Sequence, residues 1–99
     1  MNAPRGSSDD PNTGTVIVGN ERGLHARAAA KIVKLAATFD AQVMVAKGET
    51  AVAWDSILGL MMLAAGPGAR LDLRATGRQA RAALAALAEL LTRADMEEV

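Results

Sequence analysis

Hydrophobic and polar residues recur along this chain with two different periods, and each period predicts one kind of element. Runs that are β-branched or that alternate with a period of two predict four strands, at 15–18, 41–46, 50–53 and 70–75. Apolar residues spaced three or four positions apart, or gathered in a short segment, predict three helices, at 26–38, 56–63 and from Thr76 to about Arg93. This order of strands and helices predicts an α+β domain.

The faces of these elements predict how the domain is layered. Outside the hairpin at 41–53, the strands tend to show one apolar and one polar face, so we expect helices on one face of a mainly antiparallel sheet and solvent on the other. Thr76 followed three residues later by Gln79 fits a capping box for the last helix. Arg78 and Arg81 would oppose the dipole of that helix, and contact with a partner is one explanation for them.

Length and composition predict a single small domain. The chain has 99 residues, and its aromatic residues are limited to Phe39 and Trp54, so the core must be built from Ala, Val, Ile, Leu and Met. The first residues are polar and rich in Pro, Gly, Ser and Asp. We therefore expect a disordered tail at 1–13, a folded domain at 14–94 and a flexible end at 95–99.

The charge and residue counts argue against several classes of protein. Eleven basic residues balance eleven acidic ones, which does not favour binding to nucleic acid or to an anionic membrane. The absence of cysteine and the single histidine argue against a metal site. No run is long and apolar enough to span a bilayer, and residues 1–12 lack the apolar core of a signal peptide. We expect a cytoplasmic protein and a monomer.

The single histidine, His25, stands where a strand-like run ends and a helix-like run begins. The first N–H groups of a helix have no intrahelical acceptor, which makes such a position suitable for holding an anion. Arg27 adds a permanent cation with a planar fork of donors. A cation in the first turn opposes the helix dipole, so Arg27 does not stabilise the start of this helix. A bound anion nearby would explain why an arginine stands there. The alternative for His25 is an ordinary surface or capping role.

The short segment at 56–63 contains more apolar residues than one buried face of a short helix needs. Ser56, or Asp55 before it, fits the N-cap of this helix. Leu60 and Leu63 are expected in the core. The other apolar side chains predict an exposed, partner-binding patch beside His25, made of Ile57, Leu58 and Met61.

Three features together resemble the HPr family, the histidine-containing phosphocarrier proteins of the bacterial phosphoenolpyruvate-dependent phosphotransferase system. They are the motif Gly-Leu-His-Ala-Arg at 23–27, the segment Ser-Ile-Leu-Gly-Leu-Met-Met-Leu at 56–63, and the order of the elements. The resemblance extends from about Thr15 to Thr92. It implies an open-faced β-sandwich in which three helices cover one face of a four-stranded antiparallel sheet, in the order βαββαβα.

The resemblance also implies a function. Enzyme I, phosphorylated from phosphoenolpyruvate, would pass the phosphoryl group to Nδ1 of His25, and Arg27 would complement the charge of the phosphate. His25 would then pass the group to an acceptor of the enzyme IIA type, so the protein would be a carrier rather than a turnover enzyme, with no metal or organic cofactor. Ser56 falls on the family's regulatory serine, which HPr kinase/phosphorylase modifies in some bacteria, and simple helix capping is the alternative role for it.

One position departs from the family pattern, because Ala28 stands where the family usually has proline after the arginine. Proline in the first turn presets φ and removes one N–H that needs a partner. We therefore expect Ala28 to change the rate of transfer, or the stability of phospho-His25, without abolishing transfer.

The sequence is compatible with more than one function. A carrier could serve sugar uptake or a nitrogen-related regulatory branch, and the serine segment is more similar to proteobacterial carriers with regulatory branches. A regulatory binding module would control partners through Ser56 or through its unphosphorylated surface, but an intact pair of His25 and Arg27 favours the carrier. A small-molecule-binding α+β domain is a further alternative. The sequence has neither a second polar cluster nor a glycine-rich phosphate loop to support it.

Overall fold

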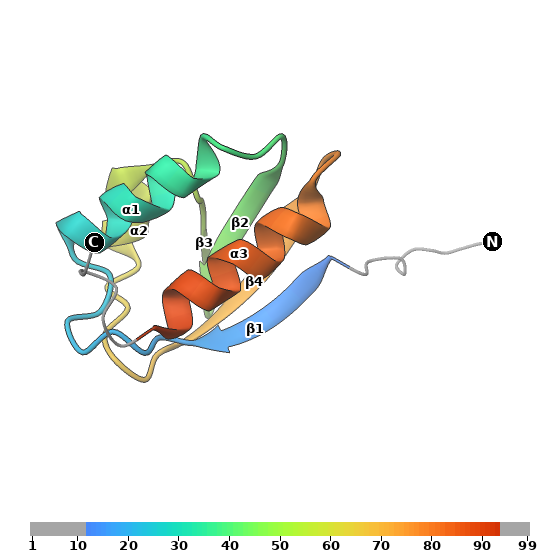
Figure 1. Ribbon diagram of the computed structural model, residues 1–99. Helices are drawn as coiled ribbons and strands as arrows, with labels where there is room; N and C mark the ends of the chain where they lie inside the picture. Colours follow the sequence, from blue (N-terminus) through green and yellow to red (C-terminus); the bar gives the residue numbers. More distant parts are fainter. Residues whose placement is uncertain (1–11, 94–99) are drawn as a thin grey trace.

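The computed structural model describes residues 12–93, which form a four-stranded antiparallel sheet with three helices on one face (Figure 1). The elements in chain order are β1 (Thr13–Ile17), α1 (Ala26–Ala36), β2 (Gln42–Lys47), β3 (Thr50–Ala53), α2 (Ile57–Met62), β4 (Arg70–Thr76) and α3 (Ala80–Thr92). The predicted order βαββαβα and the predicted open-faced sandwich are confirmed. Residues 1–11 and 94–99, which include most of the predicted tail and the predicted flexible end, lie outside the described residues.

The strands lie in the order β1-β4-β2-β3, and all neighbours are antiparallel. In the central strand β4, side chains point alternately to the two faces, as the period of two requires. Leu71, Leu73 and Ala75 are buried, whereas the residues between them are exposed. The sheet therefore has one face for the core and one for solvent, as the sequence predicts.

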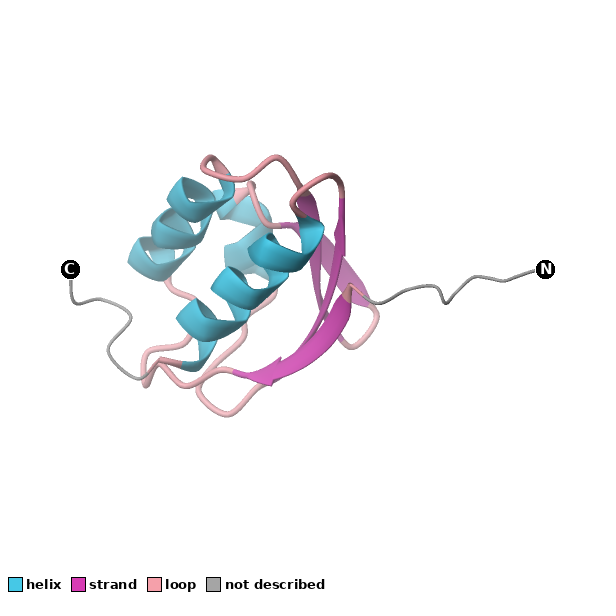
Figure 2. Cartoon of the chain, turned by 45° about the vertical axis from the view of Figure 1, so that its right-hand side comes forward, coloured by secondary structure: helices cyan, strands magenta, loops and turns pink. Residues whose placement is uncertain are grey.

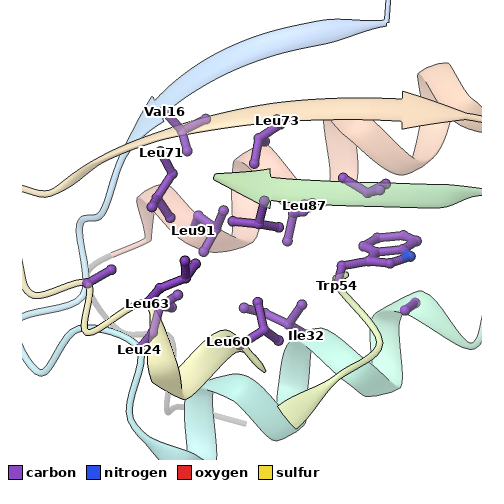
Figure 3. Packing of buried hydrophobic residues seen from close by; sticks show 14 of the residues in the cluster. Val16, Leu24, Ile32, Trp54, Leu60, Leu63, Leu71, Leu73, Leu87 and Leu91 are labelled. Carbon is purple, nitrogen blue, oxygen red and sulfur yellow. The ribbon is translucent and has the colours of Figure 1, made fainter. Parts of the chain in front are cut away.

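The three helices lie together on the apolar face of the sheet (Figure 2). Leu71 and Leu73 of β4 point towards Leu87 and Leu91 of α3, and all four are buried (Figure 3). Trp54, which follows β3, is also fully buried. Alanine fills much of the remaining buried surface of the helices, and its small side chain lets the helix backbones approach their neighbours closely. The buried alanines of α1 and α3 are Ala28, Ala29, Ala36, Ala80 and Ala83.

The predicted capping box at the start of α3 is wrong. Gln79 occupies the N-cap position, but its side chain makes no capping hydrogen bond. Instead, Gln79 Oε1 accepts a hydrogen bond from the N–H of Asp40 at 2.7 Å, and the Gln79 N–H donates to the Asp40 carbonyl at 2.9 Å. Arg78 Nε donates to Asp40 Oδ2 at 3.0 Å. The Gln79 side chain therefore makes a tertiary contact between the turn before β2 and the turn before α3. It does not form the cap that the local spacing predicts.

Other boundaries differ from the prediction by one or two residues. Strand β1 begins at Thr13, and α1 ends at Ala36. Beyond α1, Thr38 donates to the Leu35 carbonyl through both its N–H, at 3.0 Å, and its hydroxyl, at 2.8 Å, which ends the helix in a tighter turn. Among the described residues, no helix has the length and the apolar character needed to cross a membrane.

Candidate functional site

His25 is the N-cap of α1, and its ring takes part in the cap. The residue has an extended backbone, with φ −81° and ψ −179°, and its side chain is half-buried. Nδ1 accepts a hydrogen bond from the backbone N–H of Arg27 at 3.2 Å. A ring nitrogen that accepts a hydrogen bond carries a lone pair and no proton, so this geometry assigns the proton of the neutral ring to Nε2. Nδ1 is therefore the basic nitrogen, and it faces the first turn of the helix.

The loop before His25 depends on a glycine at position 23. Gly23 has φ +69°, in the left-handed region that favours glycine. A Cβ at this position would lie 2.8 Å from Gly66 Cα and closer still to the Ala65 carbonyl oxygen. The next residue, Leu24, donates its N–H to that same carbonyl at 2.9 Å. The loop after α2 therefore supports the two residues that precede His25.

Asn20, for which the sequence predicted no role, also holds this loop in place. Its side chain is only 2% exposed. Nδ2 donates to the Gly23 carbonyl at 3.2 Å, and Oδ1 accepts from the Arg22 N–H at 3.2 Å. The Gly23 N–H donates in turn to the Asn20 carbonyl at 2.9 Å. An asparagine three residues before a glycine is typical of a turn in which the side chain binds the backbone, and this spacing could have revealed its role.

Arg27 and Ala28 complete the first turn, and they lie on opposite sides of it. Arg27 is exposed, whereas the side chain of Ala28 is fully buried in the core. The first turn of α1 contains no acidic residue. An anion beside His25 would therefore meet the positive end of the helix dipole and a guanidinium group without a carboxylate of that turn to compete.

Ser56 caps α2, as the sequence predicts. Its Oγ accepts a hydrogen bond from the Gly59 N–H at 3.0 Å. Gly59 has little room around it, because an added Cβ would lie 3.0 Å from Ser56 Oγ and 3.1 Å from Val52 Cβ. The predicted regulatory phosphorylation of Ser56 stays a prediction.

Helix α2 presents an apolar patch, which we define as Ile57, Leu58, Met61 and Met62. All four are exposed, and Leu58 and Met62 most of all, at 70% and 73%. The predicted exposure of Ile57, Leu58 and Met61 is confirmed. Met62 is exposed as well, although the sequence did not predict it. Leu60 and Leu63 are buried, as predicted.

The helix that carries the patch lies close to the loop of His25. Helix α2 packs against α1, and three residues after the end of α2 the Ala65 carbonyl binds the Leu24 N–H. The helix that carries the patch and the loop that carries His25 are therefore neighbours in the fold.

Comparisons with known proteins place the chain in a family. The family model of the PTS HPr component phosphorylation site matches residues 12–93. The chain is 43% identical to the phosphocarrier protein NPr of Shewanella violacea, over 77% of this chain and 84% of that protein. It is 49% identical to the phosphocarrier protein HPr of Pseudomonas aeruginosa, over 73% of this chain and 81% of that protein.

Solved structures show the same fold. The HPr-C-His structure from Thermoanaerobacter tengcongensis superposes with a TM-score of 0.79 at 34% identity, covering 88% of this chain and 97% of that one. The phosphocarrier protein HPr from Bacillus anthracis gives 0.75 at 38% identity, covering 78% of this chain and 92% of that one. Sequence and fold agree, and the chain belongs to the HPr family of phosphocarrier proteins of the phosphotransferase system.

Proposed function

We propose that Nδ1 of His25 accepts a phosphoryl group from phosphorylated enzyme I and passes it to an acceptor of the enzyme IIA type. The observation that carries this proposal is the hydrogen bond from the Arg27 N–H to Nδ1. It leaves a lone pair, not a proton, on the nitrogen that faces the helix start. That nitrogen is the one from which a phosphoryl group would reach the N–H groups of the first turn.

The transfer step follows from this arrangement. The lone pair on Nδ1 attacks the phosphorus in line, and a new N–P bond forms as the bond between phosphorus and the donor breaks. The proton on Nε2 stays in place while the positive charge of the ring balances one charge of the phosphoryl group. The Arg27 N–H loses Nδ1 as its acceptor, and a phosphoryl oxygen can replace it. The reverse sequence of bonds delivers the group to the next protein.

Arg27 and the helix start stabilise the phosphoryl group only moderately. A helix dipole contributes about 0.3–1 kcal/mol at an exposed site, and an exposed cation adds a term of similar size. A carrier needs this balance, because a group that is held too tightly cannot be passed on. The protein is thus a reactant and a product in a relay, rather than an enzyme that turns over a substrate of its own.

The apolar patch on α2 supplies a docking surface in this proposal. Enzyme I and the acceptor must each bring a reactive group to within bonding distance of Nδ1. Exposed methionine side chains adapt to more than one partner, which suits a surface used in two successive complexes. The relatives include carriers of both names, HPr and NPr, so the proposed acceptor belongs to sugar uptake or to a nitrogen-related branch.

A regulatory function through Ser56 is the second candidate. Ser56 is half-buried, and its Oγ already accepts the Gly59 N–H. A kinase such as HPr kinase/phosphorylase would have to draw this oxygen out of the cap. Phosphate near a helix N-terminus is electrostatically favourable, whereas Asp55 next to it would repel the added charge.

Labelling with enzyme I and radioactive phosphoenolpyruvate tests the proposed function. We expect acid-labile label on the wild type, no label on His25→Ala, and full label on Ser56→Ala. A wild type that binds enzyme I but carries no acid-labile label would contradict the carrier function and favour the binding module.

A further inference from the structure

The two methionines of the apolar patch, Met61 and Met62, lie where an oxidant in solution can reach them. They are the last two residues of α2, and they are 40% and 73% exposed. The chain has no cysteine, so every sulfur atom in it belongs to a methionine. In a chain without thiols, exposed thioethers are the groups most open to oxidation by a peroxide.

A third methionine, Met44, provides an internal comparison. It lies in β2 and is half-buried. Its sulfur also accepts a weak hydrogen bond from Gln42 Nε2 at 3.9 Å. Burial and this contact both withdraw the sulfur of Met44 from an oxidant, so we expect it to react more slowly than the sulfur atoms of the patch.

Each methionine of the patch lies one helical turn after another exposed apolar residue. Residues four apart share a face of a helix, which pairs Ile57 with Met61 and Leu58 with Met62. Oxidation of a thioether to a sulfoxide turns a flexible apolar side chain into a polar one. A partner that covers these faces would then have to bury a strong hydrogen-bond acceptor, which costs free energy unless a donor meets it.

The fold of α2 does not depend on the two exposed sulfur atoms. Leu60 and Leu63 anchor the helix in the core cluster (Figure 3). At the start of the helix, Ser56 Oγ accepts the Gly59 N–H at 3.0 Å. Oxygen atoms added to the exposed side chains would leave these contacts in place, so oxidation would change the surface and not the folded structure.

We propose that Met61 and Met62 form a modification site, where a peroxide produces methionine sulfoxide and thereby weakens the docking of enzyme I. A lone pair of the thioether sulfur attacks one oxygen of hydrogen peroxide, an S–O bond forms, and the O–O bond breaks. Sulfur loses two electrons to the peroxide, and the second oxygen leaves as water. A methionine sulfoxide reductase reverses the change. The effect on docking rests on the proposed phosphocarrier function, whereas the selective oxidation does not.

Timed exposure to hydrogen peroxide, followed by mass spectrometry of the proteolytic peptides, tests the site itself. We expect sulfoxide to form several-fold faster at Met61 and Met62 than at Met44, with an unchanged circular dichroism spectrum. Saturating enzyme I should slow the oxidation of the two patch residues and not that of Met44. Equal rates at all three residues, a lost spectrum, or an absence of protection by enzyme I would overturn the proposal.

The KM of enzyme I for the protein, measured before oxidation and again after the peroxide is removed, tests the effect on docking. In the wild type we expect a rise of about tenfold, the scale expected when a polar group is buried without a partner, and we expect the reductase to reverse it. The variant Met61→Leu, Met62→Leu should show no rise on oxidation, whatever its starting KM. The matched control Met44→Leu keeps both patch thioethers and should show the full rise.

The comparison of these proteins separates the possible failures. An unaltered KM in a wild type that carries both sulfoxides would overturn the effect on docking. An equal rise in the variant Met61→Leu, Met62→Leu would also overturn it, because the sensitive group would then lie elsewhere. A lack of acid-labile label on the untreated wild type would instead contradict the phosphocarrier function, while mass spectrometry would still decide whether the oxidation is selective.

Discussion

Helices α1 and α2 begin in similar ways, but their caps do different work. In α1 the cap is the Nδ1 atom of His25, which accepts the Arg27 N–H at 3.2 Å. In α2 the cap is the Oγ atom of Ser56, which accepts the Gly59 N–H at 3.0 Å. Ser56 reaches three residues along the chain, as an N-cap serine ordinarily does, whereas His25 reaches two. The cap of α1 thus engages an atom that can also form a bond to phosphorus.

The supports of the two caps differ as well. The loop before His25 is held by backbone contacts with the 65–66 loop and by the buried side chain of Asn20. Beyond Ser56, by contrast, α2 exposes flexible apolar side chains. In the proposed function, the backbone contacts of this loop would position the reacting atom, while adaptable side chains of α2 would provide the surface for partners.

The largest expected effect comes from breaking the support of His25 with Gly23→Ala. The new Cβ would meet the 65–66 backbone, and the residue would have to keep φ +69°. Strain and overlap together should lower the free energy of unfolding by about 2–4 kcal/mol, measured by chemical denaturation. The matched control is Gly48→Ala, where φ is +61° and the space around the Cβ is open, so only the conformational cost of about 1–2 kcal/mol should appear. Equal losses would show that the contact with the 65–66 loop contributes nothing.

The next effect concerns the patch on α2. The double variant Leu58→Ser, Met62→Ser removes the two most exposed side chains of the patch and should leave stability almost unchanged. The KM of enzyme I for the protein should rise about tenfold, which corresponds to ~1.4 kcal/mol of lost binding. Ile17→Ser removes an apolar side chain that is 51% exposed on β1 and serves as the control, with no expected change in KM. A double variant with an unaltered KM would place the docking surface elsewhere.

The cap of α2 should have a smaller effect, and on stability alone. Ser56→Ala removes the acceptor of the Gly59 N–H and should lower the free energy of unfolding by about 1 kcal/mol. Ser56→Asp keeps a capping oxygen and should recover most of the loss. Labelling of His25 should be the same in all three proteins. If Ser56→Ala labels more slowly at unchanged stability, the serine has a part in the transfer that the cap does not explain.

The smallest effect is expected at Ala28, where the family usually has proline. Position 28 lies in the first turn of α1, where proline is tolerated because its missing N–H needs no intrahelical acceptor. Ala28→Pro should change the free energy of unfolding by no more than about 1 kcal/mol, because the gain from a restricted unfolded chain opposes the cost of fitting two more ring carbons at a buried position. It should alter the rate of transfer or the rate at which phospho-His25 hydrolyses, both followed with radioactive label. Identical rates would remove the hypothesis that this position tunes the site.

The sequence predicted the fold well where local pattern and tertiary packing agree. The alternation of Leu71 and Leu73 with charged residues placed β4 and its buried face correctly. The prediction failed at Gln79, because a contact with Asp40, 39 residues away along the chain, outweighed the local capping pattern. Such contacts depend on how turns meet in space, which spacing along one segment does not encode.

The candidate site was predicted in the same uneven way. The position of His25 at a helix start and the exposure of Leu58 followed from local pattern. The supporting role of Asn20 and the close approach of Gly23 to the 65–66 loop did not, because both depend on a loop that arrives from a distant part of the chain.

In the proposed function, Nδ1 of His25 carries the phosphoryl group. NMR of the protein enriched with ¹⁵N in histidine, after reaction with enzyme I and phosphoenolpyruvate, tests it directly, because the nitrogen bonded to phosphorus shows a one-bond coupling to ³¹P. We predict that this coupling appears on Nδ1 and is lost in acid. Coupling on Nε2, or a histidine ring that stays unmodified while enzyme I is phosphorylated, would contradict it.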